Sequence, residues 1–251
     1  MCCDRHFCES DSRRYSAPSG AAAAGGCYLV LMGWSDTRAD VALATVIAFA
    51  SASGATMAAP DPAAWRAYER HDYATAAKLY AEGARKGDRL AQFNIAMMLF
   101  RAEANETERG EALRWLRRAA DAGLMQAQYN MGLLYESGRT VRKSLTEATA
   151  WFERAAEQGH TEAQVSAATQ YFLGRGAPKD YAKAAYWYRE AANGGDVGAQ
   201  YILASMYEKG DGVAKDLRLA IYWYVRAAQQ GDAVALVKAR ALAREHEAGP
   251  R

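Results

Sequence analysis

Residues 199–231 read AQYILASMYEKGDGVAKDLRLAIYWYVRAAQQG, and most of this segment recurs upstream in steps of 36 residues. The step is kept without a gap by a tryptophan, a glycine, an Ala-Gln pair and an Ala-Ala pair. The tryptophans are Trp115, Trp151, Trp187 and Trp223. The glycines are Gly87, Gly123, Gly159, Gly195 and Gly231. A fixed period of this length is typical of repeat proteins, in which each unit is one supersecondary element.

Within one unit the apolar residues follow a helical period and not an alternating one. Ala127, Met131 and Tyr135 fall on one face of a first helix, and a glycine-bearing loop follows at 137–140. Ser144 with Glu147 then forms a capping box that opens a second helix, and Asp180 and Asp216 hold the same N-cap position in the next two copies. Each unit is therefore predicted to be a helix–turn–helix hairpin that ends at a glycine.

The small and large residues of a unit have complementary packing roles. Ala96, Gly132, Ala168 and Ala204 are equivalent, and their small size lets the two helices of a hairpin approach closely. The tryptophans, together with Tyr135, Tyr171 and Tyr207, are expected to fill the layer between hairpins. One hairpin of this size cannot bury its apolar face alone, so the units must stack into a superhelix with a concave side.

These residues resemble the Sel1-like repeat family, a longer-looped relative of the tetratricopeptide repeat. The resemblance covers residues 63–247, and the fifth copy carries it most completely. The matching residues there are Ala199, Leu203, Ala204, Tyr207, Gly210, Gly212, Val213, Asp216, Ala220, Trp223, Tyr224, Ala227, Ala228 and Gly231. The resemblance implies an all-α fold, a right-handed α-solenoid of stacked helix–turn–helix repeats.

Both ends of the array depart from the pattern. Residues 63–70 and 73–86 are joined by the short turn His71-Asp72, as in an ordinary tetratricopeptide hairpin. The copy that starts at Ala91 has no glycine in its loop. Residues 233–247 form a last amphipathic helix, which we expect to cap the array with a polar face turned to solvent. That face carries Lys238, Arg240, Arg244 and Glu245.

The first 58 residues are predicted to lie outside the repeat domain. Residues 1–31 are low in complexity and fit an over-extended start, with translation beginning at Met32. The apolar run at 41–50 is too short to span a bilayer, but with the small residues after it, it matches a secretory signal at 32–58. The mature solenoid would then be 59–251. The alternative is a disordered cytoplasmic tail with an incidental apolar patch.

Composition argues against several functional classes. The 31 basic and 29 acidic side chains nearly balance, so nothing indicates a nucleic-acid or anionic-membrane partner. All four cysteines precede the repeats, and the spacing of Cys2, Cys3, His6 and Cys8 matches no standard zinc pattern, although a metal there is an alternative. No nucleophile elbow, phosphate loop or metalloprotease helix is present. We therefore expect no catalytic residue, no cofactor and no metal.

The candidate site follows from analogy with tetratricopeptide grooves, where the first helix of each unit lines the concave side. Positions that recur there at i, i+4 and i+7 are the candidate partner-binding residues. They are Phe93, Met97, Phe100, Tyr129, Leu133, Glu136, Thr169, Phe172, Tyr201, Ser205 and Glu208. For Phe93 and Tyr129 the alternative is packing against the next unit. Gln92, Gln128, Gln164 and Gln200 are expected to make hydrogen bonds between repeats.

The function implied by the resemblance is protein–protein interaction. The prediction is a bacterial scaffold or adaptor, a periplasmic regulator that binds another protein or peptide in the groove and has no membrane span in its mature form. Two alternatives stay open, a cell-wall-acting enzyme or receptor and a cytoplasmic adaptor. Clustered titratable groups with shifted pKa values in the groove would favour the enzyme.

Overall fold

The computed structural model describes residues 61–101 and 106–248. This part of the chain forms eleven helices and no strand. The helices are α1 (Pro62–Glu69), α2 (Tyr73–Arg85), α3 (Arg89–Arg101), α4 (Glu106–Asp121), α5 (Met125–Ser137), α6 (Leu145–Glu157), α7 (Thr161–Leu173), α8 (Tyr181–Asn193), α9 (Val197–Lys209), α10 (Leu217–Gln229) and α11 (Ala233–Ala248). The predicted start at Met32, the signal at 32–58, the cysteine cluster and the loop at 102–105 lie outside the described residues.

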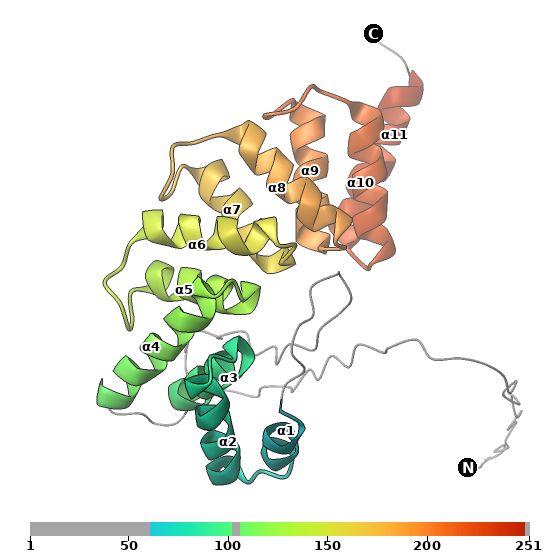
Figure 1. The fold of residues 1–251 in the computed structure, drawn as a ribbon. Helices are drawn as coiled ribbons and strands as arrows, with labels where there is room; N and C mark the ends of the chain where they lie inside the picture. Colours follow the sequence, from blue (N-terminus) through green and yellow to red (C-terminus); the bar gives the residue numbers. More distant parts are fainter. Residues whose placement is uncertain (1–60, 102–105, 249–251) are drawn as a thin grey trace, which may run out of the picture. The chain divides into compact units, whose positions relative to one another are not determined.

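The main contacts between helices all join helices that are consecutive in the chain. Each hairpin, such as α5 with α6 or α7 with α8, is followed by a helix that packs on its second member (Figure 1). Contacts that run mainly from one element to the next are typical of a solenoid, whose stability is approximately a sum over neighbouring units. The predicted all-α solenoid of stacked hairpins is therefore confirmed.

The ends of the helices are capped as the sequence predicts. Ser144, Asp180 and Asp216 each accept a hydrogen bond from a backbone N–H in the first turn of α6, α8 and α10. First helices end at glycines in the left-handed region, for example Gly174 at φ 68° after α7. The short first hairpin is also confirmed, since Asp72 caps α2 directly after α1 and its turn.

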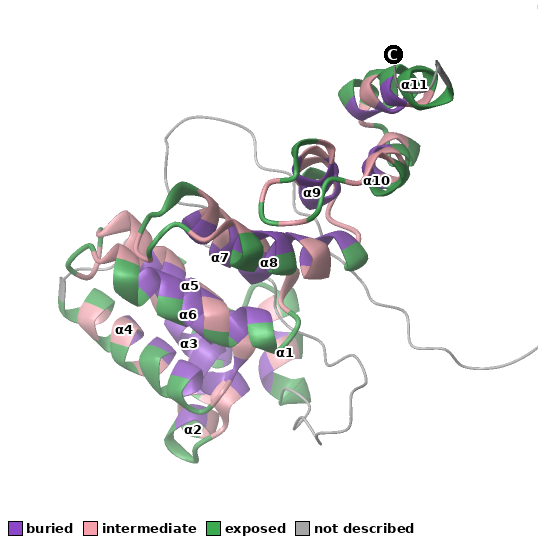
Figure 2. Cartoon of the chain, turned by 90° about the horizontal axis from the view of Figure 1, so that it is seen from above, coloured by how far each residue is buried: buried purple, intermediate pink, exposed green. Residues whose placement is uncertain are grey.

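The predicted tryptophan layer is buried. Trp151, Trp187 and Trp223 expose 3%, 8% and 7% of their surface, so they belong to the core. Trp115 is only partly buried and donates a hydrogen bond from Nε1 to Glu111. Burial is concentrated on the helix faces that meet neighbouring helices, as the purple stretches on α5 and α8 illustrate (Figure 2).

Close approach of the two helices explains the small residues. A Cβ at Gly132 of α5 would lie 2.5 Å from two ring carbons of Phe152 on α6. The equivalent alanines of α3, α7 and α9 are fully buried. The hairpin therefore closes to a distance that admits no side chain at Gly132.

Buried glutamines join each repeat to the one before it. The side-chain amide nitrogens of Gln92, Gln128, Gln164 and Gln200 each donate to a backbone carbonyl eight residues upstream, at 3.1–3.2 Å. Those carbonyls belong to alanines at the end of the preceding second helix, where each also accepts the backbone N–H of the glycine three residues later, at 2.9–3.1 Å. The predicted inter-repeat hydrogen bonds are thus confirmed.

The loop inside a hairpin also touches the preceding hairpin. Gly212, at φ 70°, lies so close to α8 that a Cβ would be 2.2 Å from the carbonyl of Tyr181. Gly176 has the same relation to Leu145 at the start of α6. These glycines let the loop backbone rest on the first turn of the previous second helix.

The last helix, α11, packs on α10 through Ala235, Ala239 and Leu242. Its exposed face is only partly the predicted polar one, because Val234 and Val237 are 60% and 68% exposed. The expectation that Lys238 meets solvent freely is corrected, since its ammonium lies 3.0 Å from Glu208 of α9. Arg240 occupies the position that is alanine or glycine in the first helices, so α11 could not accept a second helix as closely as α5 does.

Candidate protein-binding groove

The eleven predicted residues lie at three equivalent positions of the first helices α3, α5, α7 and α9, which we call the first-helix face. Two of them are not accessible, because Phe93 and Met97 expose only 1% and 5% of their surface. Tyr68 of α1 and Tyr80 of α2 pack beside these two side chains. Phe93 is therefore a packed residue, but it packs against the preceding hairpin and not against the next unit.

The other nine residues keep part of their surface exposed. They are Phe100, Tyr129, Leu133, Glu136, Thr169, Phe172, Tyr201, Ser205 and Glu208. The aromatic members rest on second helices, with the Phe172 ring 5.2 Å from Tyr181 and the Tyr201 ring 5.2 Å from Tyr224 between centroids. Each ring is thus held in place by packing while part of it stays open, which is the arrangement of a preorganised binding surface.

Polar members of the face are connected to neighbouring helices. The Gln170 amide nitrogen donates to Glu136 at 2.8 Å, and the Tyr224 hydroxyl donates to Glu208 at 2.8 Å. Burial acts to raise the pKa of Glu208, but the hydrogen bonds from Tyr224 and Lys238 outweigh it, so the pKa of this carboxyl is lowered. Both acids therefore accept hydrogen bonds from side chains of neighbouring helices.

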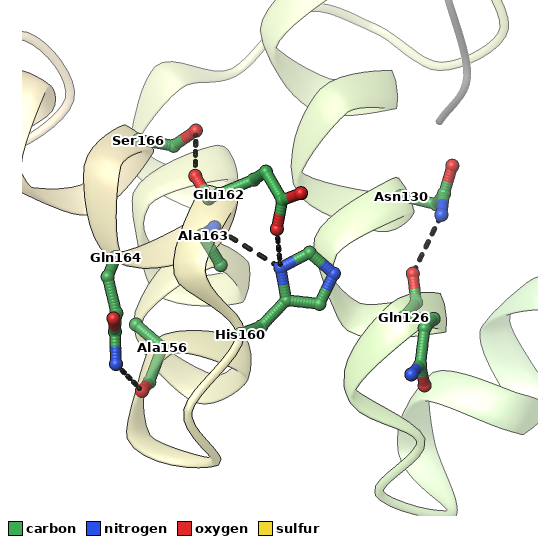
Figure 3. Close-up of polar contacts among 8 residues, drawn as sticks. All are labelled: Gln126, Asn130, Ala156, His160, Glu162, Ala163, Gln164 and Ser166. Carbon is green, nitrogen blue, oxygen red and sulfur yellow. Dashed lines mark hydrogen bonds and ion pairs between the residues drawn. The ribbon is translucent and has the colours of Figure 1, made fainter. Parts of the chain in front are cut away.

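A cluster at the junction of α5 and α7 adds a residue that the sequence analysis did not select. His160 stacks on Tyr129, with ring centroids 4.6 Å apart, and its Nδ1 lies 3.2 Å from Glu162 and 3.4 Å from the N–H of Ala163 (Figure 3). One nitrogen cannot donate and accept at once. An Nδ1 without a proton accepts the N–H of Ala163 and caps α7, whereas an Nδ1–H donates to Glu162, so the tautomer of His160 decides which contact forms.

A comparison of equivalent positions in the repeats could have identified His160 from the sequence. The residues that precede the first helices at the same position are Asp88, Leu124, His160, Asp196 and Asp232. All three aspartates accept a backbone N–H from the first turn of α3, α9 or α11, as an N-cap does. His160 is the one member of this set with an aromatic ring, and that ring stacks on Tyr129.

Several buried amide oxygens near this face have no hydrogen-bond donor. They belong to Gln92, Gln126, Asn130 and Gln170. The Asn130 nitrogen donates to the carbonyl of Gln126 at 2.7 Å, which leaves the Asn130 oxygen unpaired (Figure 3). Each of these oxygens can accept a hydrogen bond from water, so the first helices carry unused acceptors.

Within residues 61–101 and 106–248 no group of three or more histidine, cysteine, aspartate or glutamate side chains could hold a metal ion. In the same residues no helix is both long and apolar enough to cross a membrane. The three described histidines lie in different parts of the fold. His71 lies between α1 and α2, His160 precedes α7, and His246 lies in the last turn of α11. What the face offers is packed aromatic rings beside carboxylates and amides.

A solenoid of helical hairpins with partly exposed aromatics on its first helices defines the class of α-helical repeat proteins. The Sel1 repeat model matches residues 67–88, 89–124, 126–160, 161–196 and 197–232, which is most of the described chain. The chain belongs to the Sel1 repeat family. Proteins of this family are generally scaffolds for protein–protein interaction and typically lack enzymatic activity.

Solved structures agree with this assignment. A protective antigen of uropathogenic Escherichia coli with an SLR fold is 30% identical, with a TM-score of 0.67; the match covers 73% of this chain and 40% of that one. A Sel1 repeat protein from Oxalobacter formigenes is also 30% identical, with a TM-score of 0.64, covering 70% of this chain and 72% of that one. The chain thus spans less than half the length of the first of these relatives. No curated protein matches the sequence.

Proposed function

We propose that this chain is a bacterial interaction scaffold or adaptor that is exported to the periplasm and binds one protein partner along the first-helix face. The observation that carries the proposal is the row of aromatic and acidic residues on that face, which are held by neighbouring helices yet partly exposed. Rigid aromatics bordered by polar groups are what partner proteins use as anchors. Their repetition on α5, α7 and α9 suits an extended peptide or a helix.

The partner test uses site-specific photo-crosslinking in the native host. A photoreactive phenylalanine analogue is placed at Phe172 on the face and, as a control, at the exposed Arg218 on α10. The face position should yield one discrete adduct that the control does not give. Replacing Phe100 and Phe172 by alanine should weaken capture of that partner, whereas Tyr73→Ala, which removes an exposed aromatic from α2, should not. Equal capture by all variants would refute binding at this face.

The enzyme alternative is weakened by the direction of the pKa shifts. In the cluster around His160, burial raises the pKa of Tyr129, and the hydrogen bond with His160 lowers the pKa of Glu162. The Tyr129 phenol therefore stays protonated, and the Glu162 carboxylate stays ionised, over a wider pH range than usual. A general acid or base needs a pKa near the working pH, and both shifts lead away from it.

Export has its own test. If residues 32–58 act as a signal, intact-mass measurement of the protein from a periplasmic fraction should give a chain that begins near Ser53 or Ala59. A protein that retains Met1 in that fraction would refute the signal, and one found only in the cytoplasm would support the cytoplasmic adaptor.

A further inference from the structure

Four repeats carry a tryptophan at the same position. In three of them an arginine lies over the tryptophan ring, and in the fourth there is no arginine at that position. Arg118, Arg154 and Arg226 each follow their tryptophan by three residues and lie 4.7, 4.4 and 5.9 Å from its ring centroid. The equivalent of these arginines after Trp187 is Glu190. No cation of the described residues lies over the Trp187 ring. The repeat that contains α7 and α8 therefore has a carboxylate where the others have a guanidinium.

A second departure lies in the same repeat. The oxygens of Gln128 and Gln200 accept a hydrogen bond from Gln158 and Gln230, at 2.7 and 2.9 Å. The residue at the corresponding position for Gln164 is Gly194, which has no side chain to donate. Gln164 is 6% exposed and donates through its nitrogen to Ala156 (Figure 3), while the structure gives its oxygen no donor.

Glu190 and Gln164, the residues affected by these two departures, both line a hollow of about 210 Å³. The residues that line it include the polar Glu157, Glu190 and Gln164 and the aromatic Tyr186 and Trp187. Tyr186 is 51% exposed and meets Trp187 edge to face, with centroids 4.8 Å apart. Neither carboxylate has an ion-pair partner among the described residues. The hollow thus combines two negative charges, an unpaired amide oxygen and two rings.

The next repeat shows which group fits such a lining. There, Arg226 donates from Nη1 to the hydroxyl of Tyr222 at 3.0 Å and lies 5.9 Å from the centroids of both Tyr222 and Trp223. Tyr222 and Trp223 are the equivalents of Tyr186 and Trp187 and have the same edge-to-face geometry. A guanidinium donates in one plane and stacks on aromatic rings, which an ammonium does less well. Carboxylate acceptors suit it further, because charge-assisted bonds to guanidinium are the stronger ones.

We propose that the hollow between α6, α7 and α8 binds the side chain of an arginine that is supplied by another polypeptide. The incoming guanidinium takes the place that Arg226 holds in the next repeat, beside Tyr186 and Trp187, and pairs with Glu157 and Glu190. The oxygen of Gln164 accepts a further hydrogen bond from it. This site is built mainly from the second helices α6 and α8, with Gln164 of α7, and uses none of the residues of the first-helix face, so it stands independently of the function proposed above.

The test is an NMR titration of the ¹⁵N-labelled full chain with N-acetyl-arginine N-methylamide, following the indole N–H signal of Trp187, which a Trp187→Phe variant identifies. A saturable shift with a dissociation constant of about 1 mM is expected for a single side chain of this kind. The citrulline analogue, which has the same shape without the charge, should bind at least about tenfold more weakly. No movement of the Trp187 signal, or equal movement with citrulline, would overturn the proposal. An equal affinity for the lysine analogue would overturn the assignment to a guanidinium.

Two variants and a control complete the design. Glu190→Gln should weaken arginine binding by about tenfold, since one charge-assisted pair is lost. Glu190→Arg should abolish the shift, because the chain then supplies its own guanidinium as the other repeats do. Glu82→Gln, which removes an exposed carboxylate from α2, should leave binding unchanged. The other indole signals report that each variant is folded, and wild-type binding by Glu190→Arg would refute the site.

Discussion

The contact between each hairpin loop and the preceding hairpin can be tested by replacing Gly212 with alanine. Two costs are expected. The residue has φ 70°, and a side chain in the left-handed region costs roughly 1–2 kcal/mol. Its Cβ would also lie 2.2 Å from the carbonyl carbon and oxygen of Tyr181, whereas carbon atoms in contact sit about 3.5–4.0 Å apart. Moving the loop away from α8 should cost a further 1–3 kcal/mol, roughly the cost of overpacking.

Gly195 supplies the matched control for this change. It has φ 95°, and a Cβ there would meet nothing within 4 Å, so Gly195→Ala should lose only the conformational part, roughly 1–2 kcal/mol. Equilibrium unfolding in urea, followed by far-UV circular dichroism, gives both losses from the shift in midpoint at constant slope. Gly212→Ala should lose about 1–3 kcal/mol more than the control. Equal losses would refute the idea that the loop backbone rests on α8.

Three further changes test the packing between repeats. Gln200→Leu should lower the free energy of unfolding by about 1–3 kcal/mol, because the fully buried amide no longer pairs with the carbonyl of Ala192; urea unfolding that matched wild type would contradict this. The pKa of Glu208 is lowered in the folded state, so its contribution is present above the unfolded carboxyl pKa and is lost as the pH falls through the folded one. Thermal midpoints of wild type and Glu208→Gln should therefore differ at pH 7 and converge toward pH 3, and a constant difference would argue against the shift. A Cβ at Gly110 in α4 would meet nothing within 4 Å, so Gly110→Ala should raise the free energy of unfolding by about 0.5–1 kcal/mol in the same urea assay. A lower free energy of unfolding would show that the added methyl group does clash with a neighbour.

Much of the fold could be predicted from the sequence because repetition tests each local signal several times. A single Asp-x-x pattern is weak evidence for an N-cap, but Ser144, Asp180 and Asp216 stand at one position of the period and all cap a helix. The tryptophans could be assigned to the core on the same ground, and three of the four are buried. Trp115 is only partly buried, although Arg118 lies over its ring as Arg154 lies over the ring of the buried Trp151.

The candidate site was harder to predict, because position in the register does not fix exposure. Phe93 and Tyr129 are equivalent in sequence, yet Phe93 is buried beside Tyr68 and Tyr80, while Tyr129 stacks on His160 and stays partly open. The first hairpin has a shorter first helix and different aromatics from those of the complete repeats, and only the structure shows where they pack. Lys238 likewise reads as a solvent-facing residue until α11 is seen to place it against Glu208.

In a solenoid built from similar units, the residues that differ from their equivalents in the other repeats are the better guide to specific binding. A residue kept in every unit, such as the buried glutamine, is explained by stacking, since every junction has the same backbone carbonyls to satisfy. Glu190 and Gly194 have no such explanation, because each removes an interaction that other repeats make. The two losses fall in one repeat and border one hollow, where a carboxylate and a free amide oxygen replace an internal arginine and a glutamine. An external cation restores both interactions at once, so the departures are better explained as a binding site than as two separate losses of stability.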